Sequence, residues 1–159
     1  MDHVQEAKRL LALTRKEHLK DIRQLELDKA VDFFDKVVRQ HARPTEASSF
    51  DNLVKTAQRA IDNNSGDFES HLDDLRSRNF MILWRQDWFV VDQFRHLAER
   101  PYLFADSAEH AELTEAGEAA IRSNDVDKLR AILAELNSRR IGSSSDADLV
   151  NAVNVLVGR

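Results

Sequence analysis

The sequence predicts an all-α protein, with a long N-terminal helix followed by a bundle of four to five helices, and three observations support this. Only four glycines and two prolines occur among 159 residues, and 32% of the residues are charged, a composition that favours long helices over sheets. Residues 2–42 contain neither glycine nor proline. Apolar residues also recur at steps of three and four along most of the chain, which is the period of an α-helix.

Residues 1–43 are predicted to form one long amphipathic helix, a lid-like arm that stops shortly before Pro44. Leu27 and Phe34 lie on its strongest apolar stripe, and a thinner stripe lies upstream. About 40 residues in a helix span roughly 60 Å, whereas a compact chain of this length has a diameter near about 40 Å. The first half of the helix therefore rests on another domain or a second copy, or the helix bends near residues 24–28.

Residues 44–142 are predicted to form the helical bundle. Residues 44–49 are expected to be a connection, with Ser48 or Ser49 capping the next helix. The expected helices then cover, in order, residues 50–61, residues 67–100 with an optional break at 78–79 or 85–87, a helix capped by Asp106, and a fifth helix that follows the Asn124–Asp125 turn. Residues 143–159 are expected to form a short helix or a flexible tail.

The stretch from Phe80 to Arg100 is expected to be the helical segment around which the rest of the chain packs. It holds both tryptophans and three of the eight phenylalanines, and each aromatic side chain can bury roughly 150–250 Å². The first interpretation is that this stretch is core, with its interspersed charges paired at the edge. The alternative is that Trp84, Arg85 and Trp88 form a partner-binding patch, because such residues dominate interface energetics.

Composition limits the possible partners. The net charge is −5 and the sequence pI is about 5.7, so no overall basic footprint indicates nucleic acid or an anionic membrane. The lack of cysteine excludes disulfides and thiolate metal sites. The N-terminus lacks the apolar stretch of a signal peptide, and no run approaches the roughly 20 apolar residues of a membrane span. The sequence therefore predicts a cytoplasmic protein without nucleic-acid or membrane partners.

The sequence offers little chemistry. It contains no GxxxxGK, GxGxxG or HExxH motif, and its six histidines are scattered singly. Asp92 and His96 are four residues apart on a predicted helix, but a metal site needs three or four ligands. We therefore predict no catalytic residue, no cofactor-binding residue and no metal ligand, and do not expect an enzyme.

Two consecutive stretches carry a family resemblance, RNFMILWRQDWFVVDQFRHLAERPYLFAD and EHAELTEAGEAAIRSNDVDKLRAILAELNSRRIG. Together they resemble the C-terminal helical region of a divergent group of bacterial DnaK-like proteins, the seventy-kilodalton heat-shock chaperone family, over about residues 66–142. The resemblance implies that the long first helix is a lid over a peptide-binding sandwich, that the chain is a C-terminal fragment, and that ATP binds only in a separate domain. No catalytic residue lies in this part of the family.

The leading functional hypothesis is a non-enzymatic C-terminal lid or interaction module of a DnaK-like chaperone that modulates client-protein binding. Its partners would be a client polypeptide or the rest of its own chaperone chain. The alternative is a free-standing interaction or dimerisation domain, whose first helix pairs with a second copy through Leu27 and Phe34.

Overall fold

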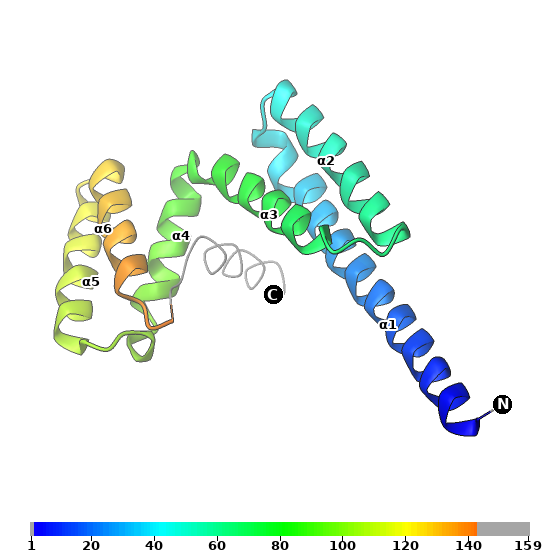
Figure 1. Cartoon of the computed structure of the whole chain (residues 1–159). Helices are drawn as coiled ribbons and strands as arrows, with labels where there is room; N and C mark the ends of the chain where they lie inside the picture. Colours follow the sequence, from blue (N-terminus) through cyan, green and yellow to red (C-terminus); the bar gives the residue numbers. More distant parts are fainter. Residues whose placement is uncertain (1, 143–159) are drawn as a thin grey trace. The chain divides into compact units, whose positions relative to one another are not determined.

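A computed structural model describes residues 2–142, which are helical almost throughout (Figure 1). This confirms the all-α prediction of a long N-terminal helix followed by a helical bundle. Within the described part there is no β-strand, only an isolated antiparallel bridge between Phe104 and Arg140. The helices are α1 (His3–Phe33), α2 (Pro44–Asp62), α3 (Phe68–Trp84), α4 (Asp87–Ala98), α5 (Ser107–Arg122) and α6 (Val126–Arg139), with short turns η1 (Phe34–Val38), η2 (Arg39–His41) and η3 (Pro101–Leu103).

The long first helix runs without a break through residues 24–28, where a bend was one of the two expectations. Asp2 caps its start by accepting the backbone N–H of Val4 at 3.1 Å. At its other end α1 continues into the π-helical turn η1 and the 3₁₀ turn η2, and Ala42 is extended. The helical rod therefore extends to His41, close to the predicted end.

The predicted connection at residues 44–49 is wrong, because these residues are the first two turns of α2. The backbone N–H at the first position of a helix has no partner within the helix, so proline, which lacks this N–H, is well suited there. Pro44 therefore begins this helix instead of only ending the previous one. Glu46 then accepts the backbone N–H of Arg43 at 2.8 Å, the carboxylate half of a capping box. Ser48 and Ser49 lie inside α2 and do not cap it.

The helix predicted over residues 67–100 is interrupted at one of the two places where a break was considered, because the chain breaks between α3 and α4. Of the two break points considered, residues 78–79 are helical and the break lies at Arg85–Gln86. Gln86 is extended (φ −93°, ψ 124°). Asp87 follows as the first residue of α4, where a carboxylate interacts favourably with the helix dipole.

The chain packs as two compact units, Met1–Asn79 (unit 1) and Phe80–Arg159 (unit 2), so the boundary falls inside α3. The predicted division into a long lid-like helix (1–43) and a bundle (44–142) stays a prediction. The tail expected at 143–159 lies outside the described residues.

Unit 1 has an apolar core shared by α1 with η1, α2 and the first part of α3. The rings of Phe34 and Phe50 stack at its centre, with centroids 3.8 Å apart and planes 11° apart. Arg39 covers the Phe34 ring at 4.6 Å and binds Asp35 and Asp51, each at 2.8 Å. Hydrogen bonds to Asp51 and then to Asp35 raise the pKa of Arg39 above its ordinary value. The buried apolar residues are Leu27, Ala30, Phe33, Phe34, Val38, Phe50, Ala57, Ala60, Ile61, Phe68, Leu72 and Leu75.

Arg23 joins α1 to the turn between α2 and α3. Its guanidinium makes two parallel hydrogen bonds of 3.0 Å to the carboxylate of Glu69 and donates to the carbonyl oxygen of Ser65 at 3.2 Å. It also lies 5.4 Å from the centre of the Phe68 ring. Because Arg23 is buried, these bonds replace water around its charge and fix the turn against α1.

Arg23→Ala is expected to lower the free energy of unfolding by about 2 kcal/mol, since charge-assisted hydrogen bonds are lost and Glu69 is left unpaired. Urea unfolding followed by circular dichroism measures the loss. Arg23→Lys is the matched control: it keeps the charge but cannot form the two-pronged bond. If Arg23→Ala unfolds at the wild-type urea concentration, the clamp contributes nothing.

Unit 2 is built on α4, α5 and α6, which lie side by side (Figure 1). Gly117 on α5 sits directly against the Phe94 ring, and a Cβ at that position would overlap the ring. The turn between α5 and α6 uses Asn124 with a positive φ of 56°, and Asp125 caps α6 by accepting the N–H of Lys128 at 3.1 Å. One buried cluster of its core consists of Val90, Phe94, Leu97, Phe104, Ala120, Leu129, Ile132, Leu133 and Leu136.

Candidate functional site

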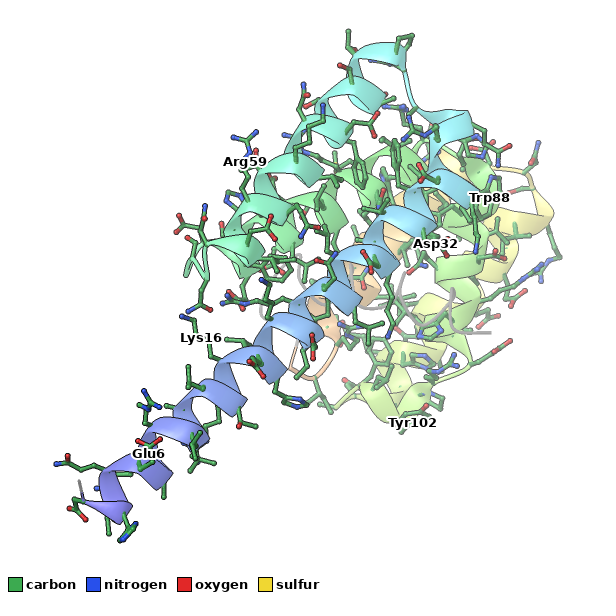
Figure 2. The ribbon with its side chains drawn as sticks, turned by 90° about the vertical axis from the view of Figure 1, so that its right-hand side faces the viewer. Glu6, Lys16, Asp32, Arg59, Trp88 and Tyr102 are labelled. Atoms are coloured by element: carbon green, nitrogen blue, oxygen red, sulfur yellow. The ribbon has the colours of Figure 1, made fainter. Side chains whose placement is uncertain are left out.

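The first 21 described residues of the chain, residues 2–22, form an exposed helical segment, here called the arm. Every residue of the arm is exposed except Glu6, which is half-buried. Figure 1 shows this part of α1 extending past α2, and Figure 2 labels Glu6 and Lys16 on it. Most of the stability of helices in proteins comes from tertiary packing of one face, so the arm depends on the packed second half of α1 for its helical form.

The arm carries large apolar side chains in water. Leu10 and Leu11 are 54% and 52% exposed, and Val4 is 58% exposed. Among the described residues, six of the eleven exposed large apolar side chains lie on the arm: Val4, Leu10, Leu11, Leu13, Leu19 and Ile22. Grouped exposure of this kind marks protein–protein or membrane contact surfaces.

Leu27 and Phe34, two of the predicted partner-binding residues, lie inside the core of unit 1. Leu27 is 1% exposed and Phe34 is fully buried against Phe50. Neither side chain can reach a partner while unit 1 is folded. Both halves of the first helix carry an apolar stripe, and α2 and α3 cover only the stronger, second one.

The other three predicted residues, Trp84, Arg85 and Trp88, surround the corner between α3 and α4. Trp84 is half-buried and stacks on Phe80 at 5.5 Å, whereas Trp88 is 44% exposed. Trp88 contacts Phe89 edge to face at 5.9 Å. Arg85 is exposed at the break itself. The corner thus presents one tryptophan to solvent, and the predicted partner-binding role of these residues stays a prediction.

Arg130 on α6 holds this corner together. Its guanidinium donates to the carbonyl oxygen of Trp84 at 3.3 Å and to Asp87 at 3.2 Å. It thereby satisfies the last carbonyl of α3 and pairs with the first side chain of α4. The sequence predicted that the charges of this stretch pair at the edge of the core, but it named no partner for Asp87 and did not identify Arg130, which lies 43 residues away.

Arg130→Ala is expected to loosen the α3–α4 corner and expose Trp84 further. The emission of the two tryptophans, both beside this corner, should move to longer wavelength and become more easily quenched by acrylamide. Arg122→Ala, at an exposed position on α5, is the control. Unchanged emission and quenching in Arg130→Ala would mean that the corner is held by apolar packing alone.

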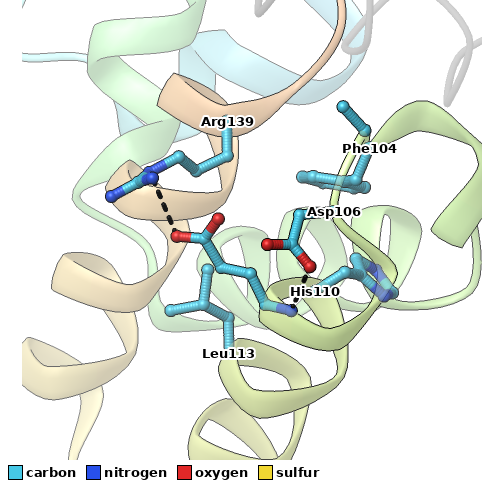
Figure 3. A pocket seen from close by; sticks show the side chains of 7 residues that line it. Phe104, Asp106, His110, Leu113 and Arg139 are labelled. Atoms are coloured by element: carbon cyan, nitrogen blue, oxygen red, sulfur yellow. Dashed lines mark hydrogen bonds and ion pairs between the residues drawn. The ribbon is translucent and has the colours of Figure 1, made fainter.

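A small cavity of about 220 Å³ lies beside the start of α5 (Figure 3). Asp106 caps α5 there, accepting the N–H groups of Ala108 and Glu109, each at 3.0 Å. Glu109 pairs with Arg139 of α6 at 2.9 Å. His110 is buried, and its Nε2 lies 3.0 Å from the carbonyl oxygen of Leu97. Since a carbonyl only accepts, this nitrogen carries the proton.

The polar groups of this cavity have structural roles. Asp106 is used as a cap, Glu109 as an ion-pair partner and His110 as a donor to the backbone of α4. The cavity is also smaller than the roughly 300–1,000 Å³ of typical ligand sites. Residues of α5, of α6 and of the segment before α5 line the cavity, and we assign it no chemistry.

Two other kinds of site are not found among the described residues. Between residues 2 and 142, no group of three or more His, Asp and Glu side chains is placed to hold a metal ion. Asp92 and His96 remain a pair without a third ligand in this part of the chain. No described helix is both long and apolar enough to cross a membrane.

Comparison with known proteins found no matching family model, no matching curated protein and no matching solved structure. The fold and the exposed arm therefore define only a class, an all-α protein of two helical units with an uncovered N-terminal helix.

Proposed function

We propose that this chain is a non-enzymatic helical interaction module that binds another polypeptide through the arm. The exposed leucines of the arm support the proposal. Covering them with a partner would be favourable by about 25 cal/mol for each Å² of apolar surface removed from water. The arm is already helical, so binding would not have to order it, which lowers the entropic cost of association.

The particular form we propose is the lid of a DnaK-like chaperone. The sequence resemblance motivates it, and the arm supplies a surface that a peptide-binding domain would cover. Fusing the chain to a lidless peptide-binding core of this family should slow the release of a labelled client peptide. The triple substitution Leu10→Asp, Leu11→Asp, Leu13→Asp should abolish the slowing, while Trp88→Ala should leave it in place. Equal release rates with and without the fused chain would count against the lid.

A free-standing interaction or dimerisation domain is the second candidate. It was expected to use Leu27 and Phe34, whose substitution by aspartate would now unfold unit 1 rather than separate two subunits. Substitutions of the exposed leucines of the arm can separate two subunits without unfolding unit 1, so these positions test the dimerisation hypothesis. Light scattering over a range of concentrations, with the same triple aspartate variant as control, measures any self-association through the arm.

A further inference from the structure

The middle of the arm, residues 8–20, is basic within an acidic protein. From Lys8 to Lys20 the chain has five basic residues and one acidic residue, Glu17, a net charge of +4. Because the whole chain carries −5, the remaining residues carry −9. The overall composition therefore hides a local positive segment, and that segment coincides with the exposed leucines.

Basic side chains and leucines share one side of the arm. At 3.6 residues per turn, Lys8 and Arg15 project from the same side of α1 as Leu11 and Leu19, with Lys16 at its edge, whereas Leu10 and Leu13 project from the other side. Within residues 2–142, Lys8, Arg15, Lys16 and Lys20 form no ion pair. Like charges at this spacing repel one another along a helix. An acidic surface would relieve that repulsion.

Such a surface exists on α5. Glu112, Glu115 and Glu118 are all exposed and follow one another at steps of three residues, so they line one side of the helix. In the described part of the chain none of the three forms an ion pair, whereas Glu109 is already paired with Arg139. The outer side of α5 thus carries exposed acidic side chains that form no ion pair in the described part of the chain, just as the arm carries exposed basic ones.

We propose that the arm of one copy docks along the outer face of α5 in a second copy, with its basic side chains against Glu112, Glu115 and Glu118. The proposal rests on the proposed interaction function and names its partner. The lengths fit, since residues 8–20 span roughly 18 Å and the 16 residues of α5 span roughly 24 Å. Ala108 and Ala111 are exposed on α5, and these small side chains let a second helix approach closely enough for the leucines to make contact.

Sedimentation velocity on the full chain tests this with two charge-reversal variants. The arm variant is Lys8→Glu, Arg15→Glu, Lys16→Glu, and the α5 variant is Glu112→Lys, Glu115→Lys, Glu118→Lys. The wild type should self-associate more weakly as salt rises, and each variant alone should associate about tenfold or more weakly because its two surfaces then repel. An equimolar mixture of the two variants should regain wild-type association, since each surface again meets its opposite charge. Circular dichroism confirms that both remain helical.

Three results would overturn the second-copy assignment. These are a wild type that stays monomeric at every concentration, association that neither variant weakens, and a mixture that does not recover. If the wild type instead floats with phosphatidylserine vesicles, and the arm variant alone loses this, the basic segment recognises a membrane. The client-release experiment distinguishes the failure of this inference from the failure of the proposed function. If client release is slowed and the slowing depends on Leu10, Leu11 and Leu13, the proposed interaction function stands even when the chain does not self-associate.

Discussion

Replacing Phe34 by alanine is expected to lower the free energy of unfolding by about 3–5 kcal/mol, the cost of removing a fully buried ring and leaving a cavity. The ring stacks on Phe50 at 3.8 Å and lies under the guanidinium of Arg39. The loss is a large fraction of the roughly 5–15 kcal/mol that stabilises an ordinary domain. Urea unfolding followed by circular dichroism is the measurement, because both tryptophans belong to unit 2.

Phe34→Leu is the matched control, since it keeps most of the volume and should cost less than about 1.5 kcal/mol. Leu10→Ala, at an exposed position on the same helix, should be close to neutral. If Phe34→Ala and Leu10→Ala cost the same, the division of α1 into a packed half and an exposed arm is wrong.

Phe94→Ala is expected to cost about 3–5 kcal/mol in unit 2, again through a cavity in a fully buried site. Its contact with Gly117 allows a sharper test. Gly117→Ala in the wild type forces a methyl group into the Phe94 ring and should cost about 1–3 kcal/mol by overpacking. In the Phe94→Ala background the ring is absent, so the same change should stabilise by up to about 1 kcal/mol through helix propensity.

Urea unfolding followed by tryptophan fluorescence measures all four proteins of this cycle, because Trp84 and Trp88 report on unit 2. Glu118→Ala, at the exposed neighbouring position of α5, is the control for a general effect of alanine in this helix. A Gly117→Ala change of the same sign in both backgrounds would show that Phe94 is not what requires glycine.

The parts of the fold that depend on local signals could be predicted from the sequence. The absence of glycine and proline from residues 2–42 predicted the unbroken first helix. Asp106 was recognised as a cap and accepts two backbone N–H groups of α5. The Asn124–Asp125 turn was placed correctly, because asparagine tolerates the positive φ that the turn requires.

Other features depend on contacts that local pattern does not contain. Pro44 was interpreted as a stop signal, although proline suits the first position of a helix equally well. The Arg23–Glu69 and Arg130–Trp84 bonds each join residues 46 positions apart, so no spacing rule finds them. Likewise Leu11 and Leu27 both lie on apolar stripes of one helix, and the packing of α2 and α3 makes one exposed and the other buried.

Hydrogen exchange of the backbone amides, measured by mass spectrometry on the dilute chain, tests most directly whether the arm is an uncovered surface. Amides in residues 3–22 should exchange much faster than those in residues 27–38, because exposed helix opens locally while packed helix opens only with its core. Adding a binding partner, either the lidless peptide-binding core or a high concentration of the chain itself, should slow exchange in the arm selectively. Equal protection of the two segments in the dilute chain would contradict the account.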